Sequence, residues 1–139
     1  CIGSGAADMG FFADCRFVLQ CDRKGDSDLV TRISGMDLCS EEFIERINPE
    51  KYGYQVADGM HTDVYALKRR GLGISCVNIS CGYYEPHTDH EYTVLKDLAK
   101  CYRLVRRGAF HALSKKIRTT HAYWPYTFRK KEREFRRIP

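Results

Sequence analysis

Two residues combine a reactive side chain with a position where a fold could expose it. Asp22 ends a nearly continuous apolar run at residues 16–22, and His87 follows a second such run, at residues 74–80, across a turn-rich loop. Carboxylate and imidazole groups are both zinc ligands in proteins. An aspartate after a strand is also a common turn former, so position alone leaves a metal site and a simple turn both open.

Short apolar runs of this kind are typical of strands buried on both faces of a sheet. The pattern predicts strands at residues 16–22, 29–34 and 74–80, and a loop at residues 52–59. Strands that alternate with helices indicate an α/β domain, which we expect to hold a mostly parallel sheet flanked by helices. Ligands of such domains collect beyond the carboxyl ends of the strands. Asp22 and His87 would then lie at the same rim.

Three helices are predicted between and after these strands. The first starts at Ser40, whose hydroxyl can cap the free amides of the first turn. The second covers residues 62–70 and stops at Gly71. The third runs from Thr88 to about residue 105, because Thr88 and Glu91 have the spacing of a capping box. His87 would therefore precede a helix N-terminus.

Four further polar residues are weaker candidates: Asp63, Asn78, Ser80 and His90. Asp63 lies at a helix start, where capping is the simpler interpretation. Asn78 and Ser80 flank the last strand, where buried polar groups are more often hydrogen-bonded structurally than catalytic. His90 is expected on the surface of the first helical turn, from which it could support a ligand at His87. We keep all four as candidates for a supporting role or for the substrate cleft.

The composition indicates one globular domain. The chain has 139 residues, of which 43% are hydrophobic, enough for one core but not for two. No run approaches the roughly 18 apolar residues of a membrane-spanning helix, and no secretory signal is visible, so we expect a cytoplasmic protein without a membrane partner. The seven cysteines are odd in number and form no CxxC pair. That pattern favours reduced, mostly buried thiols.

The net charge of +5 is concentrated in a basic tail. Residues 115–139 hold nine Lys or Arg and two Glu, together with Tyr123, Trp124, Tyr126 and Phe128. Interleaved basic and aromatic side chains can bind nucleic acid. Charge runs at chain ends are more often solvated, and we favour that interpretation for the tail.

Three segments resemble the zinc aminopeptidases related to tripeptide aminopeptidase. Residues 1–7 (CIGSGAA) resemble the stretch after the paired glutamates of that family, and residues 17–23 (FVLQCDR) resemble the strand that delivers its next aspartate. Residues 77–92 (VNISCGYYEPHTDHEY) resemble its closing motif, in which a histidine ligand precedes an acidic capped helix. The resemblance covers about residues 1–106.

The resemblance implies that residues 1–114 are the C-terminal part of a zinc-peptidase-like catalytic domain that hydrolyses peptides. In that family two zinc ions share a bridging aspartate and a bridging water. A residue matching Asp22 completes the ligand set of one ion, and a residue matching His87 completes the ligand set of the other. Zinc lowers the pKa of a bound water towards about 7 and polarises the peptide carbonyl. The implied cofactor is a pair of Zn²⁺ ions, and the implied partner is a peptide substrate.

The other ligands of the family and its general-base glutamate would lie upstream of Cys1. A chain that opens on Cys1 and a run of small residues also has the character of a piece of a longer polypeptide. We therefore expect no catalytic residue in this chain, an inactive isolated chain, and a requirement for the missing N-terminal segment. The alternative is a non-catalytic remnant or interaction module whose basic tail binds nucleic acid.

Overall fold

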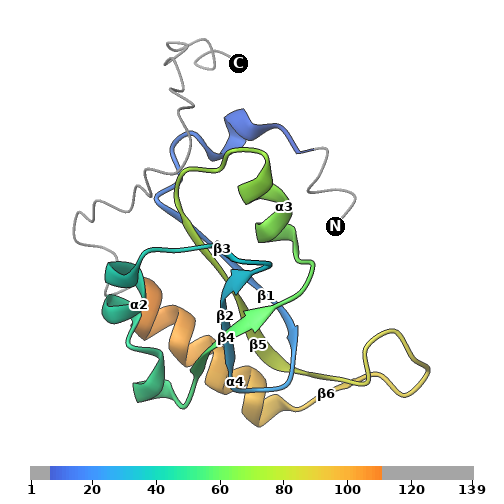
Figure 1. Cartoon of the computed structure of the whole chain (residues 1–139). Helices are drawn as coiled ribbons and strands as arrows, with labels where there is room; N and C mark the ends of the chain where they lie inside the picture. Colours follow the sequence, from blue (N-terminus) through green and yellow to red (C-terminus); the bar gives the residue numbers. More distant parts are fainter. Residues whose placement is uncertain (1–6, 111–139) are drawn as a thin grey trace, which may run out of the picture.

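The computed structural model describes residues 7–110, which form an α/β domain around one mixed sheet (Figure 1). Three strands lie side by side in the order β1 (Phe17–Lys24), β5 (Ser75–Tyr84) and β2 (Asp28–Ile33). Two further strands pair with β2: β3 (Met36–Asp37) and β4 (Gln55–Gly59). The last strand, β6 (Tyr92–Thr93), pairs with the end of β5.

The expected α/β class is confirmed, but the sheet is mixed and not mostly parallel. β1 pairs with β5, and β2 with β4, in parallel. The pairs β2–β3, β2–β5 and β5–β6 are antiparallel. Parallel neighbours need a crossover of about a dozen residues or more. The turn at residues 25–27 is too short for one, so β2 runs back against the direction of β1.

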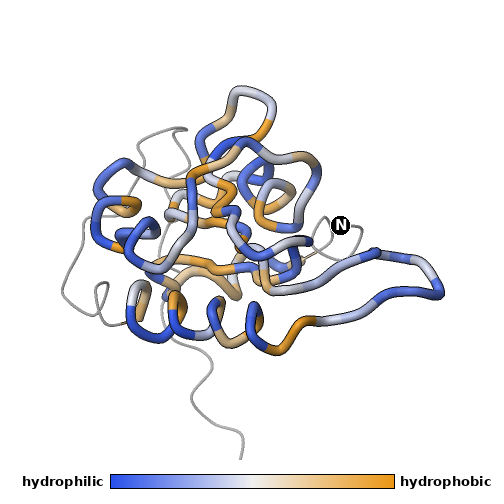
Figure 2. The backbone as a smooth tube through the Cα atoms, turned by 90° about the horizontal axis from the view of Figure 1, so that it is seen from below, coloured by the Kyte–Doolittle hydropathy of each residue, from blue (hydrophilic) through white to orange (hydrophobic). Residues whose placement is uncertain are grey.

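Helices cover both faces of the sheet, and the side chains of each strand alternate between them. The described helical segments are η1 (Met9–Phe12), α2 (Glu41–Ile47), η2 (Pro49–Tyr52), α3 (Asp63–Arg69), α4 (Leu95–Arg103) and η3 (Leu104–Phe110). Phe17 and Leu19 face the core formed with α2 and α4, whereas Val18 faces the core formed with α3. In Figure 2, hydrophobic and hydrophilic residues alternate along α4, as expected for a helix with one buried side. None of the helices within residues 7–110 is long and apolar enough to cross a membrane.

Both predicted helix starts before β5 are confirmed by their caps. The hydroxyl of Ser40 accepts a hydrogen bond from the Phe43 amide at 3.2 Å and starts α2. The hydroxyl of Thr62 accepts one from the Tyr65 amide at 3.2 Å and starts α3. A capping hydroxyl satisfies an amide that the helix itself leaves unpaired. Asp63 is thereby fixed at the first position of α3.

The prediction of a loop at residues 52–59 is wrong for its second half, which is β4. The strand pairs with β2 on one side, so its outward-facing residues stay exposed and show no continuous apolar run. Gly59 ends the strand against the core, where an added Cβ would lie 2.5 Å from Cγ1 of Val30. The close approach of the Val30 side chain to the backbone of Gly59 explains why this position holds glycine.

The predicted start of the last helix at Thr88 is also wrong, because α4 begins at Leu95. The Thr88 hydroxyl donates to the carbonyl of Glu85 at 2.8 Å and accepts from the amide of His90 at 3.2 Å, which closes a turn. Tyr92 and Thr93 then pair with β5, and the Tyr84 and Tyr92 rings stack with centroids 5.3 Å apart. That pairing requires extended backbone, so the chain cannot be helical before residue 94.

β1 is less buried than its apolar sequence predicts. Its residues are half-buried or exposed. Within residues 7–110, β1 lies at the end of the sheet and pairs with β5 alone. A strand with a neighbour on one side keeps its other edge, and part of its side chains, open.

Candidate functional site

Asp22 lies near the end of β1 and is held by two side-chain amides. Nε2 of Gln20 donates to Oδ2 of Asp22 at 2.6 Å, and Nδ2 of Asn78 donates to Oδ1 at 2.9 Å. Gln20 and Asn78 are register partners across the parallel β1–β5 pair. Asp22 itself is exposed, so its oriented carboxylate faces the solvent at this rim.

Gln20 connects Asp22 to the start of α3. Its Nε2 also donates to Oδ2 of Asp63 at 3.1 Å, and its Oε1 accepts from the amide of Val64 at 3.0 Å. The predicted candidates Asp22, Asp63 and Asn78 therefore form one polar cluster, which contains two carboxylates and is organised by an amide that the sequence analysis did not select. Gln20 precedes Asp22 by two positions, and residues two apart on a strand share a face of the sheet. This spacing could have identified Gln20 as a neighbour of Asp22 from the sequence.

Asn78 is the buried member of the polar cluster. The residue is 3% exposed, and its Oδ1 accepts no hydrogen bond from the described part of the chain. The bond from its Nδ2 to Asp22 fixes which way the amide points. Buried polar atoms without a partner are uncommon in folded proteins. Among the described residues, Oδ1 of Asn78 is an acceptor of this uncommon kind.

Ser80 does not join the polar cluster. Its hydroxyl donates to the carbonyl of Lys24 at 2.8 Å and accepts from the amide of Asp28 at 3.3 Å. These bonds connect β5 to both ends of the turn between β1 and β2. Ser80 is completely buried. Its role in the described structure is to hold this turn.

His87 lies in the turn between β5 and β6, which extends away from the body of the domain (Figure 1). It is exposed and has a φ of 64°, a conformation that is uncommon for residues other than glycine. Its amide donates to Oε2 of Glu91 at 3.0 Å, and the Tyr83 hydroxyl donates to the same oxygen at 2.8 Å. Glu91 therefore holds the backbone at His87. His90, in the same turn, is exposed.

The hydrogen bonds of this turn shift the pKa values of Glu91 and Tyr83. The His87 amide, and then the Tyr83 hydroxyl, lower the pKa of Glu91, and the nearby His87 ring contributes less. The pKa of Tyr83 is raised, mainly by its hydrogen bond to Glu91 and in smaller part by Asp22. The Tyr83 hydroxyl thus lies within electrostatic range of both the Glu91 carboxylate and Asp22. Like Gln20, Tyr83 and Glu91 were not selected as site residues from the sequence.

The described residues do not form a complete metal site. Within residues 7–110, no group of three or more His, Cys, Asp or Glu side chains is placed to hold a metal ion. No hydrogen bond between Asp22 and His87 is found in this part of the chain either. The donor chemistry nevertheless suits zinc, because an orienting hydrogen bond is the usual second partner of a carboxylate ligand.

No protein-family model, curated protein or solved structure matches this chain.

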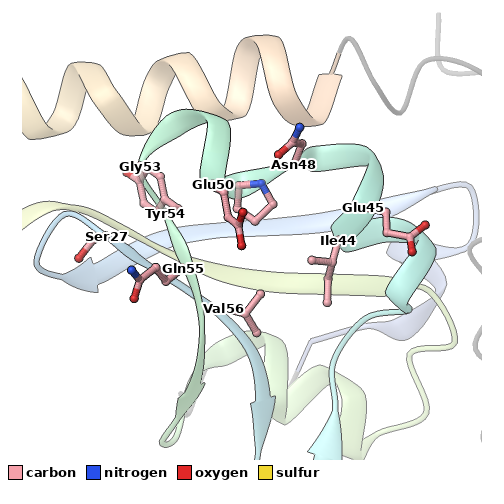
Figure 3. Close-up of a pocket in the computed structure, with 10 residues that line it drawn as sticks. Ser27, Ile44, Glu45, Asn48, Glu50, Gly53, Tyr54, Gln55 and Val56 are labelled. Carbon is pink, nitrogen blue, oxygen red and sulfur yellow. The ribbon is translucent and has the colours of Figure 1, made fainter.

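A surface groove lies elsewhere, between α2, η2 and β4 (Figure 3). Its lining includes Ile44, Glu45, Pro49, Tyr54 and Val56. None of the six predicted site residues contributes to it. The groove therefore gives no support to the predicted metal ligands.

The basic tail at residues 115–139 lies outside the described residues. The alternative that this tail binds nucleic acid therefore stays a prediction.

Proposed function

We propose that this chain supplies Asp22 and His87 to a two-zinc site that hydrolyses peptides, as part of a zinc-peptidase-like catalytic domain. The observation that supports this is the parallel pairing of β1 with β5. Adjacent parallel strands end at the same edge of a sheet, and ligands of α/β domains bind at that edge. Asp22 lies near the end of β1, and His87 lies in the turn beyond β5.

Asp22 and His87 have the chemistry of one ligand for each ion. An ionised carboxylate has about four acceptor positions, so the two amide bonds to Asp22 leave capacity for a cation. Gln20 and Asn78 would orient this carboxylate, and Glu91 would orient the backbone that carries His87. Zinc would supply a Lewis acid that polarises the peptide carbonyl and lowers the pKa of a bound water.

The remaining ligands must come from outside residues 7–110. A catalytic zinc usually has three protein ligands, whereas residues 7–110 hold no group of three such side chains placed for one ion. In the proposal Asp22 and His87 each serve one of the two ions. We propose that the other ligands and the general base lie on a further segment of a longer polypeptide, as the resemblance implies. The isolated chain would bind zinc weakly and would not hydrolyse peptides.

Titration with Co²⁺, a paramagnetic substitute for zinc, tests the two ligands in the isolated chain. Backbone amide resonances should broaden in two places, around Asp22 and around residues 85–91, and the binding should be weak. Asp22→Asn should remove only the first effect and His87→Ala only the second. His61→Ala is the matched control, because it removes an exposed imidazole from outside the proposed site. Broadening that centres on His61, or that survives both changes, would contradict the assignment.

Hydrolysis tests the complete site. In a chain that includes the segment with the remaining ligands, His87→Ala should lower kcat/KM for a peptide substrate by more than about 100-fold. Losing a residue that only orients a ligand already lowers activity by about 10–100-fold. His61→Ala should leave hydrolysis unchanged. Chelator-sensitive hydrolysis by the isolated chain would show that the site is complete without a further segment, against the proposal.

A further inference from the structure

β4 is an outermost strand of the sheet. β5 and β3 pair with successive parts of β2, whereas β4 pairs with β2 along its full length. Each stretch of a strand has room for one neighbour on each side, so β5 and β3 share one side of β2 and β4 takes the other. Within residues 7–110, β4 has no second neighbour. Such a strand keeps a row of backbone amides and carbonyls open to another chain.

Val56 directs its backbone groups to this open edge. The amide of Gln55 donates to the carbonyl of Ser27, immediately before β2, at 2.8 Å, so Gln55 faces β2. Successive residues of a strand direct their amide and carbonyl groups to opposite sides. The groups of Val56 therefore point away from β2. Val56 is also 53% exposed, so its side chain is free to contact a partner.

The groove shown in Figure 3 adjoins the open edge of β4, because Gln55 and Val56 both contribute to its lining. Its volume is about 820 Å³, which leaves room for several side chains of a ligand. Ile44 of α2 supplies an apolar wall. In Figure 3 the side chain of Glu50 extends toward the space between Ile44 and Val56.

The charged residues that line the groove are both acidic. Glu45 belongs to α2 and Glu50 to η2, and both are exposed. No ion pair to either carboxylate is found within residues 7–110. Lys100, whose Nζ lies over the ring of Tyr54, is already paired with Asp26 at 3.1 Å. The groove therefore offers two carboxylates to a positively charged ligand.

We propose that the groove beside β4 binds an extended, basic segment of a partner protein. The segment adds a strand to the sheet by pairing with the outward backbone groups of β4. Residues two apart on the added strand share a face, so an apolar side chain packs between Ile44 and Val56 while a Lys or Arg two positions away meets Glu45 or Glu50. The same carboxylates disfavour an acidic segment. This binding is independent of the proposed zinc site, whose residues do not line the groove.

The test is an NMR titration of the isotope-labelled chain with the peptide acetyl-VTKTR-amide, whose Val, Lys and Arg share one face when it is extended. The backbone amides of Val56, Glu45 and Glu50 should shift as the peptide is added. The acidic peptide acetyl-VTETE-amide should leave them unchanged. N-methylation of one alternate set of amides in the basic peptide should abolish binding, because that set faces β4. N-methylation of the other set should not.

Charge reversal tests the two carboxylates. The double change Glu45→Lys with Glu50→Lys should weaken binding of the basic peptide by at least about 10-fold, because two ion pairs are replaced by repulsion. Asp14→Lys with Asp89→Lys is the matched control. It changes the net charge equally at two exposed acids outside the groove, and it should weaken binding by less than about 2-fold. Circular dichroism of each variant establishes that it is folded.

Several results would overturn the proposal. The native chain would not respond to the basic peptide, or it would respond at another surface. The acidic and basic peptides would bind equally, or both N-methylated forms would bind like the parent peptide. Shifts of the same three amides when the protein alone is diluted would mean that a second copy, and not a partner segment, occupies the groove.

Discussion

Replacing Gly82 with alanine should lower the free energy of unfolding by at least about 3 kcal/mol. Gly82 is buried in β5 and has a φ of 80°, where a residue with a Cβ is strained by about 1–2 kcal/mol. The new Cβ would also lie 2.8 Å from the amide nitrogen of Leu98 and 2.9 Å from the carbonyl oxygen of Val94. These are backbone atoms at the start of α4, so the clash is relieved only if the helix moves away from the sheet.

The matched control is Gly35→Ala. Gly35 has nearly the same φ, 78°, but no atom lies within 4 Å of its added Cβ. The Gly35→Ala variant should therefore lose only about 1 kcal/mol of unfolding free energy, from the strained backbone conformation alone. Urea unfolding of both variants, with the slope checked for constancy, gives the comparison. Equal losses at the two positions would mean that the contact of Gly82 with α4 is not what matters.

Replacing Asn78 with aspartate should lower the free energy of unfolding by about 4 kcal/mol at pH 7, because burial and a like charge raise a carboxyl pKa by several units. The new carboxylate would be 3% exposed in the place of the amide that now donates to Asp22 at 2.9 Å. Its pKa in the folded state would exceed the unfolded value of about 4. The difference from wild type should therefore be small below about pH 4 and grow as the pH rises towards the raised pKa.

A second variant separates charge repulsion from loss of the amide. The double change Asp22→Asn with Asn78→Asp restores an amide opposite a carboxylate, with the two groups exchanged. It should recover part of the lost stability at pH 7, whereas the burial of one carboxylate remains. Unfolding midpoints of wild type and both variants across pH 4–8 provide the measurement. A loss for Asn78→Asp that is constant over this range would argue against the carboxylate contact.

The local elements were predictable where a single segment contains its own signal. Ser40 and Thr62 start helices because each hydroxyl caps an amide three residues ahead, and no distant contact is needed. The strand at residues 29–34 was recognisable for a similar reason, since its apolar side chains fill cores on both faces of the sheet. Such features depend on neighbours in sequence or on burial alone.

Features that depend on distant pairing were not predictable. The sequence between Thr88 and Glu91 satisfies the capping-box pattern, yet it closes a turn because Tyr92 and Thr93 pair with the end of β5. β4 became a strand only through its pairing with β2. Sequence periodicity also does not fix strand order, so the placement of β5 between β1 and β2 could not be foreseen.

The candidate site divides in the same way. Asp22 and Asn78 were selected from their strands, but their hydrogen bond depends on a parallel register that no local pattern specifies. The link through Gln20 to Asp63 also requires α3 to lie over that face of the sheet. His87 was selected from its loop, whereas its partner Glu91 was assigned to a helix cap. In the structure Glu91 instead accepts a hydrogen bond from the His87 amide within the turn.

The parallel pairing of β1 with β5 also affects the order in which the protein folds. Phe17 pairs with Ser75, 58 positions later in the chain, and the pair is closed by a long segment that includes β2, α2, β4 and α3. Closing such a loop costs entropy before the contact provides any stabilisation, so pairings of this kind form slowly. On a ribosome, Asp22 emerges long before Asn78, and its carboxylate stays without that partner until β5 has been synthesised. The polar cluster is thus among the last parts of the domain to form.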